Sequence, residues 1–383
     1  MNNVTQSTEW YHDEDTLRYG TAAFVLFVTM IVTAIRYVIK QRSVNELKRL
    51  RNLSLARKIY IITGANRGIG FETAKLLVQR NATVIMACRS LARAEKAIKK
   101  IKAETGKGRM IPFKLDLEKF ETIVNFAKFI KRDFPKFDCL INNAGVSKPT
   151  GLKTTINYVE LHYGTNYLGH FFLTRLLLNG IIANSARVVI VSSLFHEDCD
   201  FDVDTLCLCA FEEPYSPKWG NEYYIRSKFA NFYHAHSLTQ LKIDTVVYCP
   251  GYMRTNFISD YIPRWYNIIC APFIWIGAQT AAYGAKNIIF CATEVQNTDE
   301  ENPANGYYID SMDVELSKAY FDEEEAKELW DQSEAMCDSV LNYEMNIIKA
   351  SKNGFFDSIF SRQATGQRAH AGSRTLFDDE TQL

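Results

Sequence analysis

The sequence predicts an α/β protein organised around a doubly wound parallel sheet, and three observations lead to this prediction. Short apolar runs rich in β-branched residues alternate with longer stretches of helical periodicity from residue 58 onward. The first of these runs ends in three closely spaced glycines, Gly64, Gly68 and Gly70. Several later runs end in small or polar residues, which would lie at the edge of such a sheet where ligands bind.

Seven segments are predicted as strands, and helical stretches separate them. The strands are residues 59–63, 83–87, 110–114, 139–142, 187–191, 245–248 and 307–310. A representative helix covers residues 91–104, where Ala94, Ile98 and Ile101 fall on one stripe. Because strands joined by helices pair in parallel through right-handed crossovers, we expect a seven-stranded sheet of the Rossmann type.

Composition and charge narrow the classes of function. The 383 residues, 47% of them apolar, suffice for one large α/β domain with appendages. Lys plus Arg equal Asp plus Glu at 44 each, and without a basic excess we expect no nucleic-acid partner. Nine scattered cysteines, an odd number, favour a reducing compartment over a disulfide framework. His196, Cys199, Cys207 and Cys209 match no structural zinc spacing, so no metal site is predicted.

Five parts are predicted along the chain. They are a polar N-terminal segment (residues 1–20), a transmembrane anchor (21–39), a basic linker (40–57), the α/β domain (58–349) and a disordered tail (350–383). The tail is predicted to be disordered because it contains few apolar residues. Its last residues, Thr381-Gln382-Leu383, could offer a carboxylate to a peptide-binding module, although chance explains such an ending better.

The predicted anchor, residues 21–39, is almost wholly apolar and is broken only by Arg36. At about 1.5 Å per residue, a helix over this run just crosses a bilayer core of roughly 30 Å. Basic residues crowd its C-terminal side, whereas only Arg18 precedes it, so a single-pass anchor would leave the main domain in the cytosol. Membrane lipid is therefore an expected partner, and the endoplasmic reticulum is the expected organelle. The alternative is an interfacial or partner-bound helix.

The turn after the first strand is suited to holding a phosphate. Gly64 can take backbone angles closed to other residues, while Gly68 and Gly70 lack the Cβ atoms that would keep a pyrophosphate from the next helix's N–H groups. An ordinary strand-to-helix loop is the alternative. We expect a dinucleotide to contact six residues of this turn: Gly64, Asn66, Arg67, Gly68, Ile69 and Gly70.

The end of the second strand favours NADP(H) over NAD(H). No carboxylate is present there to repel a 2′-phosphate, and Arg89 can pair with one, with Arg67 as a second cation. The alternative is that Arg89 is a solvated surface arginine. Past the third strand come Asp116 and Leu117. Asp116 could accept from the adenine amino group, cap the helix expected to begin near Glu118, or do both.

Later strand ends add further candidate residues. Small residues after the fourth strand would let a backbone approach the cofactor, and a turn after the sixth strand could bring a hydroxyl to the nicotinamide carboxamide. These residues are Asn143, Ala144 and Gly145, then Pro250, Gly251 and Thr255. Asn166, expected inside a helix, must satisfy its amide either by holding a water near the site or by a purely structural bond.

A tyrosine and a lysine share one helix face. Tyr224 and Lys228 are four residues apart, whereas four past Tyr223 is a serine. A phenol of reference pKa about 10 is a poor base at neutral pH, and a neighbouring ammonium favours its ionised form. The fifth strand ends in Ser192 and Ser193, of which only one hydroxyl can face the cleft, and spacing does not say which.

A stretch rich in aromatic side chains, residues 257–275, follows the sixth strand. One interpretation is an apolar lid over a lipid-like substrate. Another is a patch that rests on the membrane surface beside the anchor, and a third is an ordinary core helix.

In this order, the motifs resemble those of the short-chain dehydrogenase/reductase superfamily over about residues 58–347. Within it the chain is similar to the membrane-anchored retinol-dehydrogenase-like branch. The supporting segments are residues 142–145, residues 164–171 and the long insertion between Ser193 and Tyr224. The resemblance implies a catalytic tetrad of Asn166, Ser193, Tyr224 and Lys228, and it selects the second serine of the pair. Tyr224 and Lys228 would also contact the cofactor.

The resemblance implies NADP(H)-dependent interconversion of a lipophilic alcohol and its aldehyde or ketone, of retinoid, steroid or polyprenoid type. Tyr224 would exchange the proton as general acid or base, helped by Lys228. Ser193 would hydrogen-bond the reacting oxygen, and Asn166 would hold a relay water. The alternative is a membrane-tethered NADP(H)-binding sensor or scaffold without turnover. A homodimer is left open.

Overall fold

The computed structural model describes most of the predicted α/β domain. It covers residues 53–106, 108–147, 159–193, 222–251, 279–293 and 322–352, with short pieces at 27, 29–30, 155, 307–309 and 312–313. The chain divides into two compact units, Met1–Ser333 and Glu334–Leu383. The sheet and its helices, described next, belong to the first unit.

The sheet has the strand order β3-β2-β1-β4-β5-β6-β7-β8. The strands are β1 (Ile59–Thr63), β2 (Thr83–Cys88), β3 (Arg109–Lys114), β4 (Cys139–Asn142), β5 (Arg187–Val191), β6 (Thr245–Cys249), β7 (Tyr307–Ile309) and β8 (Met312–Asp313). Strands β1 to β7 are all parallel, which confirms the predicted parallel sheet of the Rossmann type, although the sheet has eight strands rather than the predicted seven. The prediction missed β8, which pairs antiparallel with β7, because a strand of two residues carries no periodic signal.

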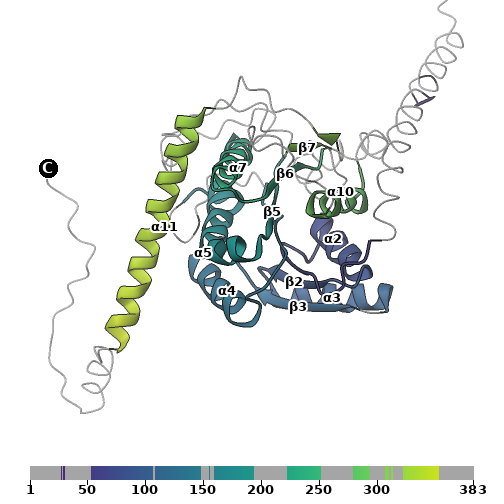
Figure 1. Cartoon of the computed structure of the whole chain (residues 1–383), viewed down its shortest axis with the longest axis horizontal. Coiled ribbons are helices and arrows are strands. Elements are labelled where there is room, and N and C mark those ends of the chain that lie inside the picture. The colour runs from purple at the N-terminus through teal and green to yellow at the C-terminus, as the bar shows by residue number, and fades with distance from the viewer. Residues whose placement is uncertain are drawn as a thin grey trace, which may run out of the picture. The chain divides into compact units, whose positions relative to one another are not determined.

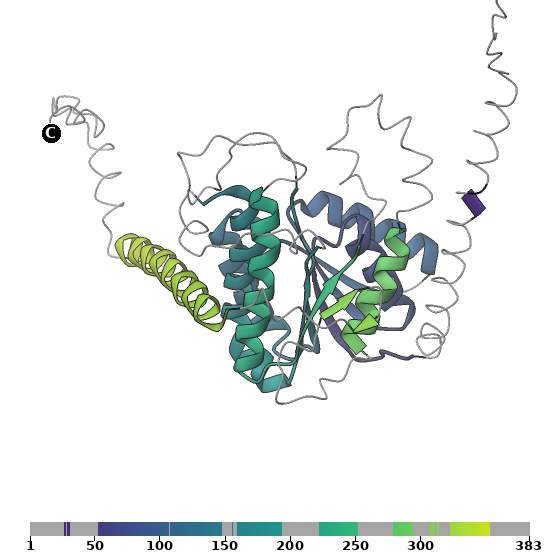
Figure 2. The ribbon, with the colours of Figure 1, turned by 90° about the horizontal axis from the view of Figure 1, so that it is seen from above.

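Helices cover both faces of the sheet (Figures 1 and 2). On one face lie α4 (Phe120–Asp133), α5 (Gly169–Asn184) and α7 (Glu222–Gln240), and on the other lie α2 (Gly68–Gln79), α3 (Leu91–Thr105) and α10 (Ala281–Thr293). A short π-helix, η2 (Tyr163–Leu168), leads into α5, and α11 (Glu323–Lys352) ends the described chain. The arrangement is the doubly wound layering that the sequence predicts.

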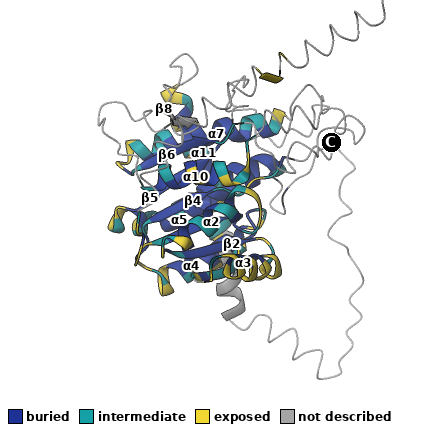
Figure 3. Cartoon of the chain, turned by 90° about the vertical axis from the view of Figure 1, so that its right-hand side faces the viewer, coloured by how far each residue is buried: buried dark blue, intermediate teal, exposed yellow. Residues whose placement is uncertain are grey.

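Strands β1, β2, β4, β5 and β6 are buried along nearly their whole length, in dark blue in Figure 3, whereas the edge strand β3 is only partly buried. Ile61 and Ile62 are neighbours in β1 and point to opposite faces, yet both are fully buried. Such a strand reads as a continuous β-branched run because helices cover each face. The α2, α3 and α10 layer packs Leu77, Ile98 and Ile288 into one core cluster with the sheet.

The strand order reverses between β1 and β4, which are neighbours in the sheet although β2 and β3 lie between them in sequence. Ile61 pairs with Ile85 of β2 on one side and with Leu140 of β4 on the other. The carboxyl ends of β1 and β4 are therefore the switch point at which sheets of this kind bind ligands.

Several predicted segments lie outside the described residues. Apart from residues 27, 29 and 30, these are the predicted anchor, the insertion at 194–221 with its His and Cys residues, the aromatic stretch 257–275, Thr255 and the end of the chain after Lys352. Helix α11 continues three residues into the segment predicted as a disordered tail. Among residues with described positions, no helix combines the length and the apolar character needed to cross a membrane.

At Gly169, α5 approaches the loop after β3 closely. A Cβ atom there would lie 2.8 Å from the Leu117 backbone oxygen and 2.9 Å from the Leu117 Cβ. We therefore expect Gly169→Ala to lower the free energy of unfolding by about 1 to 3 kcal/mol, as overpacking of a core does. Denaturant titration of the purified protein measures this difference.

Gly180→Ala is the matched control on the same helix. Its Cβ would meet only the Phe137 ring, at 3.2 Å, so that a shift of a few tenths of an ångström by one side chain, and none by the backbone, relieves the contact. Equal free energies of unfolding for the two variants would contradict this account of the contact.

Candidate active site

Two turns meet at the switch point, one after β1 and one after β4. Gly64 has φ +69°, and a Cβ added to it would lie 3.0 Å from the Cα of Ala144. A Cβ at Gly70 would lie 2.5 Å from Asn143 Nδ2 and 2.7 Å from the Gly64 carbonyl oxygen. These two glycines are therefore required by the packing of the turns themselves, a reason that the sequence alone does not provide.

The N-terminus of α2 is open to an anion. Arg67 precedes the helix, no side chain accepts from its first N–H groups within the described residues, and its first turn holds no acidic residue. Gly68 has φ +60°, and a Cβ there would meet no atom within 4 Å. Asn66 and Ile69 are half-buried beside it. Free N–H groups at the positive end of a helix dipole attract phosphate.

Arg89 lies where the sequence places it, just past β2, and it has a protein partner. Its Nη1 is 2.5 Å from Glu118 Oε1, and 60% of the side chain is exposed. Ser90, the next residue, accepts from the Arg93 N–H and caps α3. Arg89 is thus available to a phosphate from the solvent side, but it would have to share its charge with Glu118.

Asp116 and Leu117 follow β3, and both are buried. The Asp116 carboxylate accepts from the Glu118 N–H at 3.3 Å, so it closes a local turn. Helix α4 begins only at Phe120, after Lys119. Of the two roles that the sequence leaves open for Asp116, the cap of α4 is therefore not formed, because residues 117–119 lie between Asp116 and the first residue of the helix.

Asn166 lies in the π-helix η2 and is fully buried. Its Oδ1 accepts from the Val146 N–H at 2.8 Å, and its Nδ2 donates to the Val146 carbonyl and to Ser227 Oγ, each at 3.0 Å. Of the two alternatives left open by the sequence, the amide takes the structural one. A single wide turn inside a helix often marks a functional position.

The two serines after β5 differ in their bonds. The hydroxyl of Ser192 is buried and donates to the Lys228 carbonyl oxygen at 2.8 Å. Its hydrogen is therefore committed to the backbone of α7. Ser193 is half-buried at the strand end. This difference agrees with the selection of Ser193 as the serine that faces the cleft.

Lys228 is buried beside Tyr224 on α7. Its Nζ donates to the Val191 carbonyl at 2.9 Å and lies 5.7 Å from the centre of the Tyr224 ring. A Cβ on Gly145 would be 3.7 Å from this Nζ and 3.4 Å from Asn166 Oδ1, so the structure brings the β4 turn, η2 and α7 together here. Burial lowers the pKa of Lys228 to about 8.

A buried carboxylate and imidazole next to Tyr224 were missed in the sequence. Glu160 Oε1 is 2.7 Å from His162 Nδ1, and Glu160 Oε2 accepts from the Tyr163 N–H at 2.8 Å. The His162 ring meets the Tyr224 ring edge to face, with 6.4 Å between their centres. The available signal was a carboxylate three residues before the N–H that it accepts from, which is the spacing of an N-cap directly before helical residues 161–163.

Thr63 and His170 were also missed as site residues. The Thr63 hydroxyl lies under the β4 turn and accepts from the N–H groups of Asn143 and Ala144, each at 2.9 Å. His170 Nε2 contacts the same hydroxyl at 2.9 Å. Thr63 and His170 are 107 positions apart, so no sequence spacing indicates that they are in contact.

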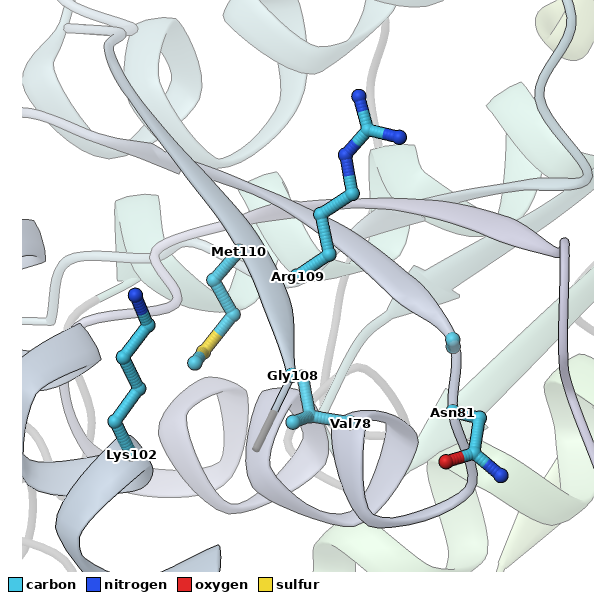
Figure 4. Close-up of a pocket in the computed structure, with 7 residues that line it drawn as sticks. Val78, Asn81, Lys102, Gly108, Arg109 and Met110 are labelled. Atoms are coloured by element: carbon cyan, nitrogen blue, oxygen red, sulfur yellow. The ribbon is translucent and has the colours of Figure 1, made fainter. Parts of the chain in front are cut away.

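After β6, Gly251 has φ +65° and is half-buried, as is Pro250 before it. This supports a turn at that strand end, while Thr255 lies outside the described residues. The hollow of about 430 Å³ in Figure 4 is elsewhere. It is lined by Val78, Lys102, Arg109 and Met110, at the start of β3 and hence at the opposite edge of the sheet.

Comparison with known proteins agrees with this geometry. A family model described as short chain dehydrogenase matches residues 58–198. Retinol dehydrogenase 14 of Homo sapiens is 33% identical over 299 residues, which cover 73% of this chain and 86% of that protein. Dehydrogenase/reductase SDR family member 13 of Bos taurus is 32% identical over 288 residues, 73% of each chain.

A solved structure is similar as well. The crystal structure of an uncharacterized protein from Mycobacterium Paratuberculosis superposes with a TM-score of 0.56 at 30% identity, covering 75% of this chain and 95% of that one. This chain is a short-chain dehydrogenase of the retinol-dehydrogenase-like branch. The family that the motifs indicate is thereby confirmed, and the protein is an oxidoreductase that acts on CH–OH groups.

The burial of Lys228 predicts a pH-dependent stability. Burial lowers its folded-state pKa to about 8, whereas the ordinary value is 10.5. Between these two pKa values the unfolded dehydrogenase binds more protons than the folded one. The buried charge of Lys228 therefore lowers the free energy of unfolding by its full amount below pH 8, and this loss disappears as the pH nears 10.5. We expect the difference in free energy of unfolding, Lys228→Met minus wild type, to fall by about 2 kcal/mol between roughly pH 7 and 9.5, because wild type gains stability over this range.

Denaturant titrations at both pH values measure this change. Lys286→Met is the control, because Lys286 is an exposed lysine on α10. A difference between Lys228→Met and wild type that stays constant over this pH range would rule out a lowered pKa.

Proposed function

We propose that this dehydrogenase is NADP(H)-dependent and interconverts a lipophilic alcohol with its aldehyde or ketone. The observation that carries the proposal is the buried ammonium of Lys228 beside the ring of Tyr224, at the carboxyl ends of the strands. A buried charge whose one described acceptor is a carbonyl lowers the stability of the fold. A role in ionising the nearby phenol of Tyr224 explains why the lysine is buried there despite this loss.

The residues at the switch point fit a dinucleotide. Gly64 and Gly70 leave no room for a Cβ between the turns, and the first N–H groups of α2 have no side-chain acceptor among the described residues. These groups, with Arg89 and the turn at Asn143, would hold the cofactor. When bound, the nicotinamide supplies or accepts the hydride.

Tyr224 would exchange a proton with the substrate oxygen. In the reducing direction its hydroxyl donates the proton as the carbonyl becomes an alcohol, and in the oxidising direction its phenolate takes that proton back. The positive charge of Lys228 favours the phenolate and so supports both directions. Ser193 would donate a hydrogen bond to the reacting oxygen and hold it near Tyr224.

The lipophilic substrate class rests on two supports. Two relatives are named retinol dehydrogenases 14 and 12, and they are 33% and 32% identical to this chain. The apolar stretches 21–39 and 257–275 suit an enzyme that takes its substrate from a membrane, with the dehydrogenase domain on the cytosolic side of the endoplasmic reticulum.

Tyr224→Phe tests the proposal. We expect kcat to fall by about 10² to 10⁴, the usual contribution of a general acid or base, with the dissociation constant for NADPH nearly unchanged. The assay follows NADPH absorbance with a panel of retinoid, steroid and polyprenoid carbonyls. Tyr223→Phe is the control, since Ser227, rather than a lysine, lies four residues after Tyr223.

Full turnover by Tyr224→Phe would refute the role of this tyrosine. Wild-type protein that binds NADPH but turns over no member of the panel would instead indicate a sensor or scaffold.

Arg89→Asp tests the cofactor preference. The substitution replaces a cation with a carboxylate that repels a 2′-phosphate and also faces Glu118. We expect kcat/KM for NADPH to fall by about 10-fold or more while that for NADH changes little or rises. Arg93→Asp makes the same charge change at an exposed position of α3 and controls for net charge. Equal losses with both cofactors would show that Arg89 does not read the phosphate.

A further inference from the structure

His170 occupies the first turn of α5 and is only 2% exposed. Its Nε2 is 2.9 Å from the hydroxyl oxygen of Thr63, the last residue of β1. Its Nδ1 is 3.0 Å from the backbone carbonyl oxygen of Asn166, in the π-helix η2. The His170 imidazole therefore bridges two parts of the site. One is the end of β1, where the predicted cofactor turn begins, and the other is η2, which carries the predicted catalytic residue Asn166.

The Thr63 end of the bridge continues into the β4 turn. The hydroxyl oxygen accepts from the N–H groups of Asn143 and Ala144, each at 2.9 Å. Asn143 Nδ2 also donates to the Thr63 carbonyl oxygen at 2.8 Å. The backbone predicted to line the cofactor is thus fixed by the same hydroxyl that His170 contacts.

The protons along this chain can be assigned from the bonds. The Asn166 carbonyl only accepts, so His170 Nδ1 must carry a hydrogen. The Thr63 hydroxyl already accepts twice, and its own hydrogen has His170 Nε2 at 2.9 Å, nearer than the Ile141 carbonyl oxygen at 3.4 Å. A neutral imidazole satisfies every atom. Burial, together with the positive charge of Lys228, agrees with this state and lowers the pKa of His170 to about 4.

We propose that His170 is a positioning residue for the reaction: it holds the Asn166 turn at a fixed distance from the Asn143 and Ala144 backbone and so sets the cofactor turn against the catalytic side chains. This inference rests on the proposed function. Without the imidazole, the Thr63 hydroxyl loses an acceptor and the Asn166 carbonyl loses a donor, both in a buried place. The two turns would then relax separately, and a small misplacement at a reacting centre is costly for the rate.

Helix α5 has a second attachment that does not use the imidazole. The Thr174 hydroxyl donates to the His170 carbonyl at 2.8 Å and accepts from Asn142 Nδ2 at 3.0 Å. This pair ties the helix to the end of β4. Loss of the His170 ring should therefore disturb the site more than the fold.

His234 on α7 provides a matched control. It is also 2% exposed, and among the described residues neither of its ring nitrogens has a hydrogen-bond partner. Its neighbours are the rings of Tyr167, Phe171 and Trp330. Replacement of His234 by Phe removes an imidazole that is as buried as that of His170. It breaks neither of the hydrogen bonds that His170 makes to Thr63 and Asn166.

The experiment compares His170→Phe, His170→Gln and His234→Phe in the full chain. For each we would measure the NADPH dissociation constant by fluorescence, and kcat and KM separately. We expect His170→Phe to lower kcat by about 10- to 100-fold and to weaken NADPH binding by about 5-fold. His170→Gln, which keeps one donor and one acceptor, should recover part of both, and His234→Phe should stay within about twofold of wild type.

A cycle with Thr63→Val tests the bridge itself. Because both substitutions break one chain of bonds, the double variant Thr63→Val with His170→Phe should lose much less than the product of the two single losses. Losses that multiply would overturn the proposal. So would values of kcat and NADPH affinity for His170→Phe that match those of His234→Phe.

Two further outcomes keep the inference separate from the proposed function. If wild type shows no turnover, the proposed function fails, and the NADPH affinities of the same variants still decide whether His170 orders the cofactor turn. If His170→Phe does not fold, Thr63→Val must lose at least about fivefold more kcat than Thr63→Ser, which keeps the hydroxyl. Equal values for these two would overturn the inference.

Discussion

The site depends on the contact between the turns after β1 and after β4. Gly64 lies against Ala144, and Gly70 lies against Asn143, at distances that exclude any side chain at the glycines. Hydrogen bonds from the β4 turn to Thr63 hold the same two backbones together. Because β1 and β4 are neighbours where the strand order reverses, this contact lies at the switch point where sheets of this kind bind ligands.

Around that contact the protein accepts polar groups that a core usually excludes. Lys228 is 4% exposed, Asn166 is fully buried, and Glu160, next to His162, is 5% exposed. Each has hydrogen-bond partners, since buried polar atoms without partners are costly. Lys228 still carries a cost for its charge, since burial lowers its pKa to about 8. A concentration of such groups at the edge of one sheet is typical of a catalytic site rather than of a packing core.

The sequence predicts the parts of this protein that depend on local pattern. Short, mostly apolar runs marked β1 to β7, and the four-residue spacing paired Tyr224 with Lys228. Contacts between distant residues left no such pattern. The bridge from Thr63 to His170, the approach of Gly169 to Leu117 and the bond between Asn166 and Val146 all depend on how far two elements are apart in space. The sequence left open whether Asp116 caps α4, because a carboxylate can close a turn or begin a helix with the same spacing.

The π-helix η2 explains how these long-range contacts fit together. Its wide turn ends where the Gly169 N–H bonds the Gly164 carbonyl five residues back, and α5 continues with ordinary geometry. In the turn, the Asn166 amide bonds the backbone of Val146, just past the β4 turn, while its carbonyl oxygen bonds His170. One residue thus joins the predicted cofactor turn to α5 through its side chain and its backbone at once. In a regular α-helix each carbonyl oxygen points along the helix axis to the N–H four residues on. The wide turn changes this pattern at Asn166, so that its carbonyl oxygen bonds the His170 ring while its side chain bonds Val146.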